Sequence, residues 1–181
     1  MNNRSRSIRL VSLRLLAFTE HMFRIGFGTD IHRLTPGRPL VIGGVTIESD
    51  LGADGHSDAD VLMHAITDAL LGALALGDLG THFPNDEPRW HNAESTIFLK
   101  YAFGLVKERG YEISNLDCVI DLERPKLRPH MDLMRHNIAA ALETDISRVS
   151  IKAKTGEQVD SVGERRALRA EAVVLLNNIT P

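Results

Sequence analysis

Apolar residues recur along this chain at two spacings, one typical of helices and one typical of strands. A spacing of three to four residues predicts helices at 57–76, at 93–109 and from Pro129 to about Leu142. Alternation of apolar and polar residues predicts strands at 23–28, 113–123, 149–154 and 168–176, and a hairpin over 40–47. This mixture predicts an α+β fold in two layers, in which helices cover one face of a mixed sheet.

The other face of the predicted sheet is not uniformly polar. Val119, Val149 and Val173 are expected on it. Since an apolar sheet face must be covered to be stable in water, the pattern predicts that a partner chain packs there.

The bulk composition is that of one ordinary globular domain. The chain has 181 residues, of which 43% are hydrophobic and 25% are charged. A net charge of −3 gives no reason to expect nucleic acid or an anionic membrane as a partner. The single cysteine, Cys118, excludes an internal disulfide framework and a Cys-x-x-Cys zinc site.

Residues 1–21 differ from the rest of the chain. They carry four arginines against one acid, Glu20, and contain no apolar stretch as long as a membrane span or a secretory signal. We expect either a poorly ordered extension or a true start at Met22, followed by one domain over 22–181. The expected location is the bacterial cytoplasm, and the Arg- and Ser-rich composition leaves plastid import as the less favoured alternative.

The segment from His56 to Asp68 concentrates polar chemistry at the start of a predicted helix. Ser57 is a suitable N-cap, and Asp60 three residues later completes a capping box. His64 lies four residues from both Asp60 and Asp68, so the three share one helix face. A histidine flanked by carboxylates can bind a metal, but the same pattern also occurs on an ordinary capped and solvated helix.

Two further ligand candidates lie at the end of the first strand. If the strand continues through Asp30 and His32, their side chains point to the same side. With His64 they make a two-histidine, one-carboxylate set, which holds Zn²⁺ tetrahedrally and leaves one position open. The alternative is a merely polar strand end.

Anion-binding groups accompany this set. His56 and Ser57 open the histidine helix, where anions bind well, and four cations elsewhere could meet phosphate: Lys126, Arg128, Lys152 and Lys154. The spacing supports a metal and an anionic substrate, without naming the reaction.

Several short motifs together resemble the 2-C-methyl-D-erythritol 2,4-cyclodiphosphate synthases. They are Arg-Ile-Gly-Phe-Gly-Thr-Asp-Ile-His at 24–32, Ile-Gly-Gly-Val at 42–45, His-Ser-Asp-Ala-Asp-Val at 56–61 with His64, Ala-Leu-Gly-Asp-Leu-Gly at 75–80, Phe-Pro at 83–84, Arg-Pro-Lys at 124–126, Pro-His at 129–130 and Lys-Ala-Lys-Thr-Gly-Glu at 152–157. The resemblance extends in register over about residues 23–176.

The resemblance implies a homotrimer with active sites between adjacent subunits. The implied reaction converts 4-diphosphocytidyl-2-C-methyl-D-erythritol 2-phosphate to the 2,4-cyclodiphosphate and CMP, in the non-mevalonate route to isoprenoids. It further implies Zn²⁺, or another divalent cation, on Asp30, His32 and His64. A second ion, Mg²⁺ or Mn²⁺, would bind with the substrate diphosphate at Glu157. Asp60 and Asp68 would then be a cap and a supporting group.

The resemblance also assigns substrate contacts. His56 and Ser57 correspond to groups that hold the attacking 2-phosphate, and Thr155 to a hydroxyl that steadies the transition state. The remaining implied contacts are Asp30, Ile31 and His32 beside the metal; Asp78, Leu79, Gly80, Phe83, Pro84, Asn85, Asp86 and Glu87 around the methylerythritol; Leu122, Pro125, Lys126, Leu127 and Arg128 in the cytidine diphosphate pocket of the adjacent subunit; and Lys154, Gly156 and Glu157 near the diphosphate.

The chain departs from the family pattern at three places. Lys154-Thr155-Gly156-Glu157 stands where the family has Thr-Thr-Thr-Glu, and Asn85 changes a loop contact. Glu164 replaces a family arginine, which Arg165 or Arg166 could substitute. Two alternatives remain open. The same ligands could serve another zinc-dependent phosphoester or diphosphate hydrolase, and Glu164 keeps open a trimeric metal-binding relative without turnover.

Overall fold

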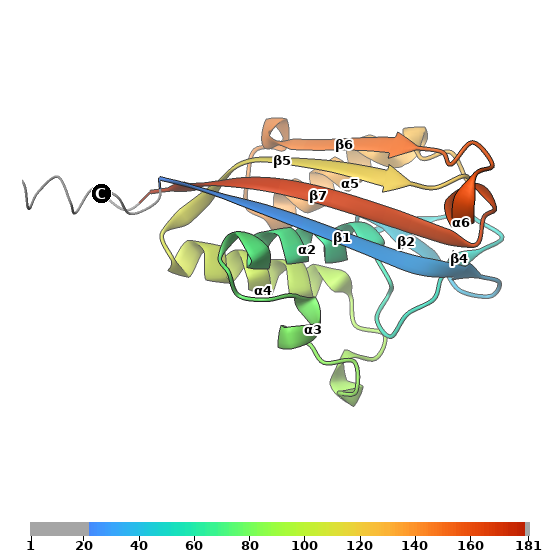
Figure 1. Cartoon of the computed structure of the whole chain (residues 1–181), viewed down its shortest axis with the longest axis horizontal. Helices are drawn as coiled ribbons and strands as arrows, with labels where there is room; N and C mark the ends of the chain where they lie inside the picture. The colour runs from blue at the N-terminus through green and yellow to red at the C-terminus, as the bar shows by residue number, and fades with distance from the viewer. Residues whose placement is uncertain (1–21, 180–181) are drawn as a thin grey trace, which may run out of the picture.

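The computed structural model describes residues 22–179, which form a twisted five-stranded sheet with helices on one face (Figure 1). The expectations for residues 1–21 lie outside the described residues. The strand order β4-β1-β7-β5-β6 makes the sheet mixed, which confirms the α+β prediction.

The long strand β7 lies at the centre of the sheet, between two other long strands that run antiparallel to it. β1 (Phe23–Thr35) pairs with β7 (Ala167–Asn178), which pairs on its other side with β5 (Tyr111–Asp121). β6 (Val149–Lys154) runs parallel to β5, and β4 (Gly52–Ala53) is a short strand on the edge of β1. β2 (Leu40–Ile42) and β3 (Val45–Ile47) form the predicted hairpin, in which both turn glycines adopt positive φ angles.

Three helices form the second layer. α2 (Val61–Ala73) packs on β1 and β7, α4 (Ser95–Glu108) packs on α2, and α5 (Met131–Ala141) lies on the crossover between the parallel strands β5 and β6 (Figure 1). The short elements are α3 (Leu79–His82), α6 (Asp160–Gly163) and the 3₁₀ turns η1 (Pro88–Trp90), η2 (Arg128–His130) and η3 (Ile146–Arg148). Within residues 22–179, no helix combines the length and the apolar character needed to cross a membrane.

Two glycines let α2 lie directly on the backbone of β1. A Cβ atom at Gly26 would lie 1.8 Å from the carbonyl oxygen of Ala69, and one at Gly28 would lie 2.1 Å from that of Ala65. No larger residue fits at either position without moving the helix. This close packing brings His64 on α2 next to the later part of β1.

The sheet face opposite the helices carries exposed apolar side chains. Ile25 is 72% exposed, Phe27 58%, Ile31 55% and Val173 44%. The expectation of an incompletely polar second face is therefore confirmed for this part of the sheet. Phe27 and Val173 lie opposite each other in the β1–β7 ladder, so exposed apolar side chains adjoin on this face.

Val149 does not belong to that face, so its prediction was wrong. It is opposite Leu116 in the parallel β5–β6 ladder, and both side chains are buried in the core. Residues opposite each other in a ladder point to the same face, which fixes Val149 on the helix side.

The boundaries predicted for α2 were also wrong at both ends. The helix begins at Val61, and Asp60 rather than Ser57 is its N-cap. It ends at Ala73 with Leu74 as C-cap, before the expected stop at Gly77, because Ala75 turns the chain at φ 56°.

Candidate active site

Asp30, His32 and His64 converge on one point between β1 and α2. The Oδ2 atom of Asp30 lies 2.9 Å from His32 Nε2 and 2.9 Å from His64 Nδ1. The two ring nitrogens are 3.2 Å apart. This arrangement confirms that β1 continues through both residues and that their side chains meet the histidine of the helix.

The hydrogen bond of His32 on the side away from the cluster determines which of its ring nitrogens carries the proton. Nδ1 lies 3.0 Å from the backbone carbonyl oxygen of Asp54, which can only accept a hydrogen bond. His32 therefore donates from Nδ1, and its Nε2 lone pair points toward Asp30 and His64.

The far nitrogen of His64 lies between two serine hydroxyls. Its Nε2 is 2.8 Å from Ser95 Oγ and 3.2 Å from Ser57 Oγ. Ser57 also accepts a hydrogen bond from the Ala59 backbone N–H at 3.2 Å. Ser57 was singled out from the sequence, whereas Ser95 was missed, because its position beside His64 depends on how α4 packs on α2.

Burial and mutual attraction have opposite effects on the pKa values of Asp30 and His32. Partial burial disfavours a charge on Asp30, but hydrogen bonds and attraction from His32 and His64, whenever these rings carry a proton toward it, outweigh this and hold its pKa well below the usual range. Burial likewise disfavours protonated His32, yet Asp30 raises the pKa of His32 above its ordinary value. A positive charge is therefore favourable at the centre of the cluster.

The three residues fit a divalent cation. Their ligand atoms lie within 4.8 Å of one another, and together they supply two imidazole nitrogens and one carboxylate oxygen. This donor set suits Zn²⁺ and leaves room for one further ligand. The predicted convergence of these three side chains is confirmed.

Asp60 and Asp68, which flank His64 on the helix, are not part of the ligand cluster. Asp60 is fully buried and accepts hydrogen bonds from the backbone N–H groups of Gly43, Gly44, Leu62 and Met63. Burial raises the pKa of Asp60, against the effect of these bonds. Asp68 accepts from the Leu79 N–H at 2.7 Å, so it anchors α3 rather than the ring of His64.

A hollow of about 310 Å³ opens beside the cluster, and we call it the histidine hollow. It is lined by Asp30, His32, Gly55, His56, Ser57, His64, Leu79, Phe83, Asn85, Trp90 and Phe98. Phe83, Trp90 and Phe98 form an aromatic wall, in which ring centroids lie 4.5–5.6 Å apart.

Only some of the residues expected around the methylerythritol line this hollow. Leu79, Phe83 and Asn85 do, whereas Asp78, Gly80, Pro84, Asp86 and Glu87 do not. Ile31, expected beside the metal, does not line the hollow either. The carboxylate of Asp78 accepts from the backbone N–H and hydroxyl of Thr81, so it caps α3. Hydrogen bonds from Thr81 lower the pKa of Asp78.

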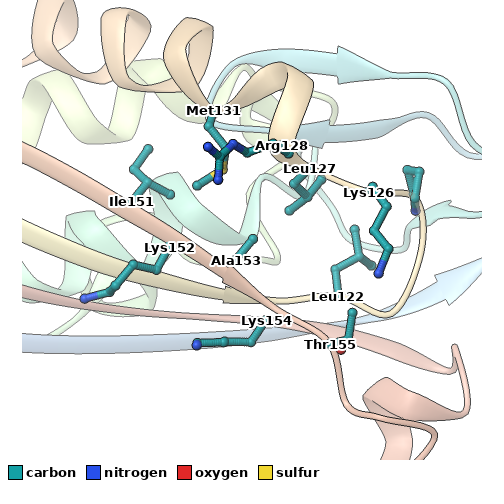
Figure 2. A pocket seen from close by; sticks show the side chains of 11 residues that line it. Leu122, Lys126, Leu127, Arg128, Met131, Ile151, Lys152, Ala153, Lys154 and Thr155 are labelled. Carbon is teal, nitrogen blue, oxygen red and sulfur yellow. The ribbon is translucent and has the colours of Figure 1, made fainter.

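A second hollow, of about 600 Å³, lies between β6 and the segment that leads from β5 to α5 (Figure 2). We call it the basic hollow. It is lined by Leu122, Pro125, Lys126, Leu127, Arg128, Met131, Ile151, Lys152, Ala153, Lys154 and Thr155. All five residues expected between 122 and 128 line it, as do all four cations that the sequence offered for phosphate.

Glu157 and Gly156 follow the basic hollow without lining it. Thr155 donates its hydroxyl hydrogen to Glu157 Oε1 at 2.9 Å, and Glu157 has a φ of 50°. A Cβ at Gly156 would lie 2.5 Å from the backbone nitrogen of Gly163, so the loop packs tightly against α6. Glu157 is not part of the Asp30–His32–His64 cluster.

The two arginines after Glu164 are both engaged in ion pairs. Arg165 pairs with Asp50 at 2.5 Å, and Arg166 pairs with Glu164 at 2.6 Å. Arg165, but not Arg166, lines a recess with Arg124 and Lys126, next to the basic hollow. Of the two candidates for the missing family arginine, Arg165 has the better position.

Comparison with known proteins gives matches over nearly all of residues 22–179. A family model described as the YgbB family matches residues 23–177. A relative from Solibacter usitatus (strain Ellin6076), named 2-C-methyl-D-erythritol 2,4-cyclodiphosphate synthase, is 51% identical over 153 residues, which cover 84% of this chain and 96% of the relative. The chloroplastic enzyme of that name from Arabidopsis thaliana is 52% identical over 154 residues, 85% of this chain and 67% of the relative.

A solved structure agrees with these matches. It is described as 2C-methyl-D-erythritol-2,4-cyclodiphosphate synthase in a form bound to CDP. It is similar to this chain with a TM-score of 0.79 and 42% sequence identity, over 85% of this chain and 100% of that one.

Proposed function

The chain belongs to the YgbB family of 2-C-methyl-D-erythritol 2,4-cyclodiphosphate synthases, and from this we propose its reaction, the conversion of 4-diphosphocytidyl-2-C-methyl-D-erythritol 2-phosphate to the 2,4-cyclodiphosphate and CMP. This is a cyclising lyase step of isoprenoid biosynthesis. The observation that supports it best is the pairing of a two-histidine, one-carboxylate cluster with a separate hollow lined by four cations.

The reaction requires no protein nucleophile. The 2-phosphate of the substrate attacks the β-phosphorus of its own diphosphate, the new P–O bond closes the ring, and the bond to the CMP phosphate breaks. The enzyme must hold both phosphates in line and balance the charge that moves to the leaving CMP. Cys118 is buried in the core, in agreement with a reaction that uses no thiol.

Asp30, His32 and His64 would hold a divalent cation, most suitably Zn²⁺. The chemistry it would supply is polarisation of a phosphoryl oxygen, which makes phosphorus a better electrophile. Glu157 would provide a carboxylate for a second ion, Mg²⁺ or Mn²⁺, bound with the diphosphate. The exposed position of Glu157 leaves its carboxylate accessible to substrate.

The residues beside the cluster would position the attacking phosphate. His56 is exposed in the histidine hollow, where its ring can donate to a phosphate oxygen. The Ser57 oxygen already accepts a hydrogen bond from Ala59, so its hydroxyl hydrogen can be donated to the same phosphate. The aromatic wall and the loop around Asn85 would enclose the methylerythritol.

The basic hollow would receive the cytidine diphosphate. Lys126, Arg128, Lys152 and Lys154 surround an apolar floor made by residues such as Leu122, Ala153 and Ile151 (Figure 2). A floor of this kind suits a planar base, and the cations suit a diphosphate. A similar protein solved in a form bound to CDP supports a ligand of this kind. Thr155, at the edge of the hollow, would steady the transition state by hydrogen bonding to the diphosphate.

We further propose that the active site forms between copies of the chain in a homotrimer. The histidine hollow and the basic hollow have no lining residue in common, although one substrate must occupy both. A head-to-tail ring places the basic hollow of one copy against the histidine hollow of the next. The exposed apolar side chains of β1 and β7 would be covered at the centre of such a ring.

The decisive experiment is an assay of the purified chain with the cytidyl substrate, Zn²⁺ and Mg²⁺ or Mn²⁺. We expect CMP and the cyclic diphosphate in equal amounts, identified by mass. Release of inorganic phosphate from simple nucleoside diphosphates, without a cyclic product, would indicate a hydrolase. Zinc binding without any product would indicate a relative that has lost turnover.

A further inference from the structure

Ser95, the first residue of α4, lies against the side of His64 that faces away from the cluster. Its side chain is completely buried, and its Oγ is 2.8 Å from His64 Nε2. The ring of His64 is thus held between the cluster at Nδ1 and this hydroxyl at Nε2.

Asp58 determines the direction of the Ser95 hydroxyl. One carboxylate oxygen of Asp58 accepts the backbone N–H of Ser95 at 3.0 Å, and the other accepts the Ser95 hydroxyl hydrogen. The N-cap residue of α4, Glu94, makes no side-chain cap hydrogen bond. Asp58 therefore caps α4 from the loop before α2, and its own N–H donates to the Ala93 carbonyl at 3.0 Å. The Asp58 oxygen that accepts the Ser95 hydroxyl also accepts the Asp60 N–H at 3.3 Å.

The donor–acceptor direction of these hydrogen bonds determines the tautomer of His64. An ionised carboxylate only accepts, so the single hydroxyl hydrogen of Ser95 points at Asp58. The Ser95 oxygen must then accept from His64 Nε2–H. That tautomer leaves the Nδ1 lone pair directed at Asp30 and His32, where a cation would bind.

We propose that Asp58 and Ser95 are positioning residues that hold His64 with Nε2 protonated and Nδ1 free to bind the metal. The backbone carbonyl of Asp54 fixes the tautomer of His32 in the same way. Each histidine of the cluster therefore has its tautomer fixed by a hydrogen bond at the ring nitrogen that faces away from the cluster. Ser57, at 3.2 Å from Nε2, cannot set it alone, because nothing fixes the direction of its own hydroxyl hydrogen. The inference rests on the proposed metal site, not on the identity of the reaction.

The sharpest variant is Asp58→Asn. The asparagine oxygen can accept the Ser95 backbone N–H at the position of Oδ2, which preserves the cap of α4 at the loss of the longer 3.3 Å bond from the Asp60 N–H. The NH₂ group then donates to Ser95 Oγ. The hydroxyl is then forced to donate to His64 Nε2, and the ring must carry its proton on Nδ1. Ser95→Ala removes the acceptor without imposing the opposite tautomer, so its effect should be smaller.

Two measurements on the full chain test the proposal. Titration with Zn²⁺ alone should show affinity about 10- to 100-fold lower for Asp58→Asn, and a smaller loss for Ser95→Ala, as is usual for groups that orient metal ligands. Nitrogen-15 NMR of the histidine rings should show His64 with a proton on Nε2 in the wild type and on Nδ1 in Asp58→Asn.

Thr67→Val is the matched control, because Thr67 is a buried hydroxyl on the same helix that donates to the Met63 carbonyl at 2.7 Å without touching His64. It should keep the wild-type zinc affinity and tautomer. Wild-type zinc affinity in Asp58→Asn, or a proton on Nδ1 of His64 in the wild type, would overturn the proposal. If the variants only loosen the fold, thermal stability falls but the tautomer of the folded fraction stays the same, which also overturns it. A failed cyclisation assay with the predicted tautomers would refute the reaction and leave this inference intact.

Discussion

The histidine hollow and the basic hollow hold their functional groups in opposite ways. In the first, every ligand of the cluster has a hydrogen-bond partner in the fold, through Asp54 for His32 and through Ser95 for His64. In the second, within residues 22–179, only Lys152 of the four lining cations forms an ion pair, with Asp117. The first hollow is a preorganised ligand set, and the second is a set of charges available to an incoming anion.

The two hollows meet different chemical requirements. A metal ligand must have one protonation state and one orientation, which buried hydrogen bonds provide. A diphosphate carries charge that mobile lysines can meet as it arrives, and apolar floor residues can hold the base. Variants of the two hollows should therefore fail in different ways.

His64→Ala should have the largest effect. It removes one of three ligands, so zinc binding and turnover should both be lost, while most of α2 remains folded because its core residues are unchanged. Zinc content by elemental analysis and helix content by circular dichroism measure this. His136→Ala, an exposed histidine on α5, is the control and should keep both. Zinc retained at wild-type level in His64→Ala would refute the ligand assignment.

Lys126→Ala should fail at substrate binding while keeping zinc. A charge-assisted contact is worth about 1.5–3 kcal/mol, so the affinity for CDP should fall about 10- to 100-fold. Calorimetric titration with CDP measures the loss, and Lys100→Ala, an exposed lysine on α4, should bind normally. Loss of zinc from Lys126→Ala would contradict the separation of the two hollows.

Asp117→Asn should give the smallest effect, and one of opposite sign on binding. Removing the partner of Lys152 makes the basic hollow more positive, so CDP should bind slightly more tightly at low salt. The hydrogen bond from Lys152 holds the pKa of Asp117 below its ordinary value. The pair therefore stabilises the fold above about pH 4, and this contribution is lost as pH falls through the lowered pKa.

For an exposed pair the stabilisation is about 0.2–1 kcal/mol. Chemical denaturation of wild type and Asp117→Asn at pH 7 and at pH 3 should show a gap in unfolding free energy that narrows at the lower pH. A difference in unfolding free energy that grows as the pH falls would contradict the predicted pH dependence of the ion pair.

The two hollows also differ in what the sequence revealed. Asp30 and His32 could be paired from strand alternation alone, and the four cations were visible as charges in the sequence. The meeting of His64 with Asp30 depends on Gly26 and Gly28, whose role in close helix–strand packing appears only when the facing carbonyls are known. The family resemblance supplied the pairing that spacing left open.

The wrong N-cap of α2 and the missed site residues have the same cause. Asp60 becomes the N-cap of α2 because it also accepts from Gly43 and Gly44 of the distant β-hairpin, which no local pattern shows. Ser95 and Trp90 were missed as members of the site because their segment reads locally as a helix start and a packing loop. Long-range contacts determined both outcomes.

Mixing two inactive variants tests most directly whether one active site is built from the hollows of two copies. His64→Ala and Lys126→Glu are each purified, unfolded together, refolded as mixed oligomers and assayed for the cyclic diphosphate. In a head-to-tail ring with random mixing, about one site in four combines an intact histidine hollow with an intact basic hollow from the next copy. We therefore expect recovery of about a quarter of wild-type activity. Activity no higher than that of the two variants assayed separately would show that each copy works alone and would contradict it.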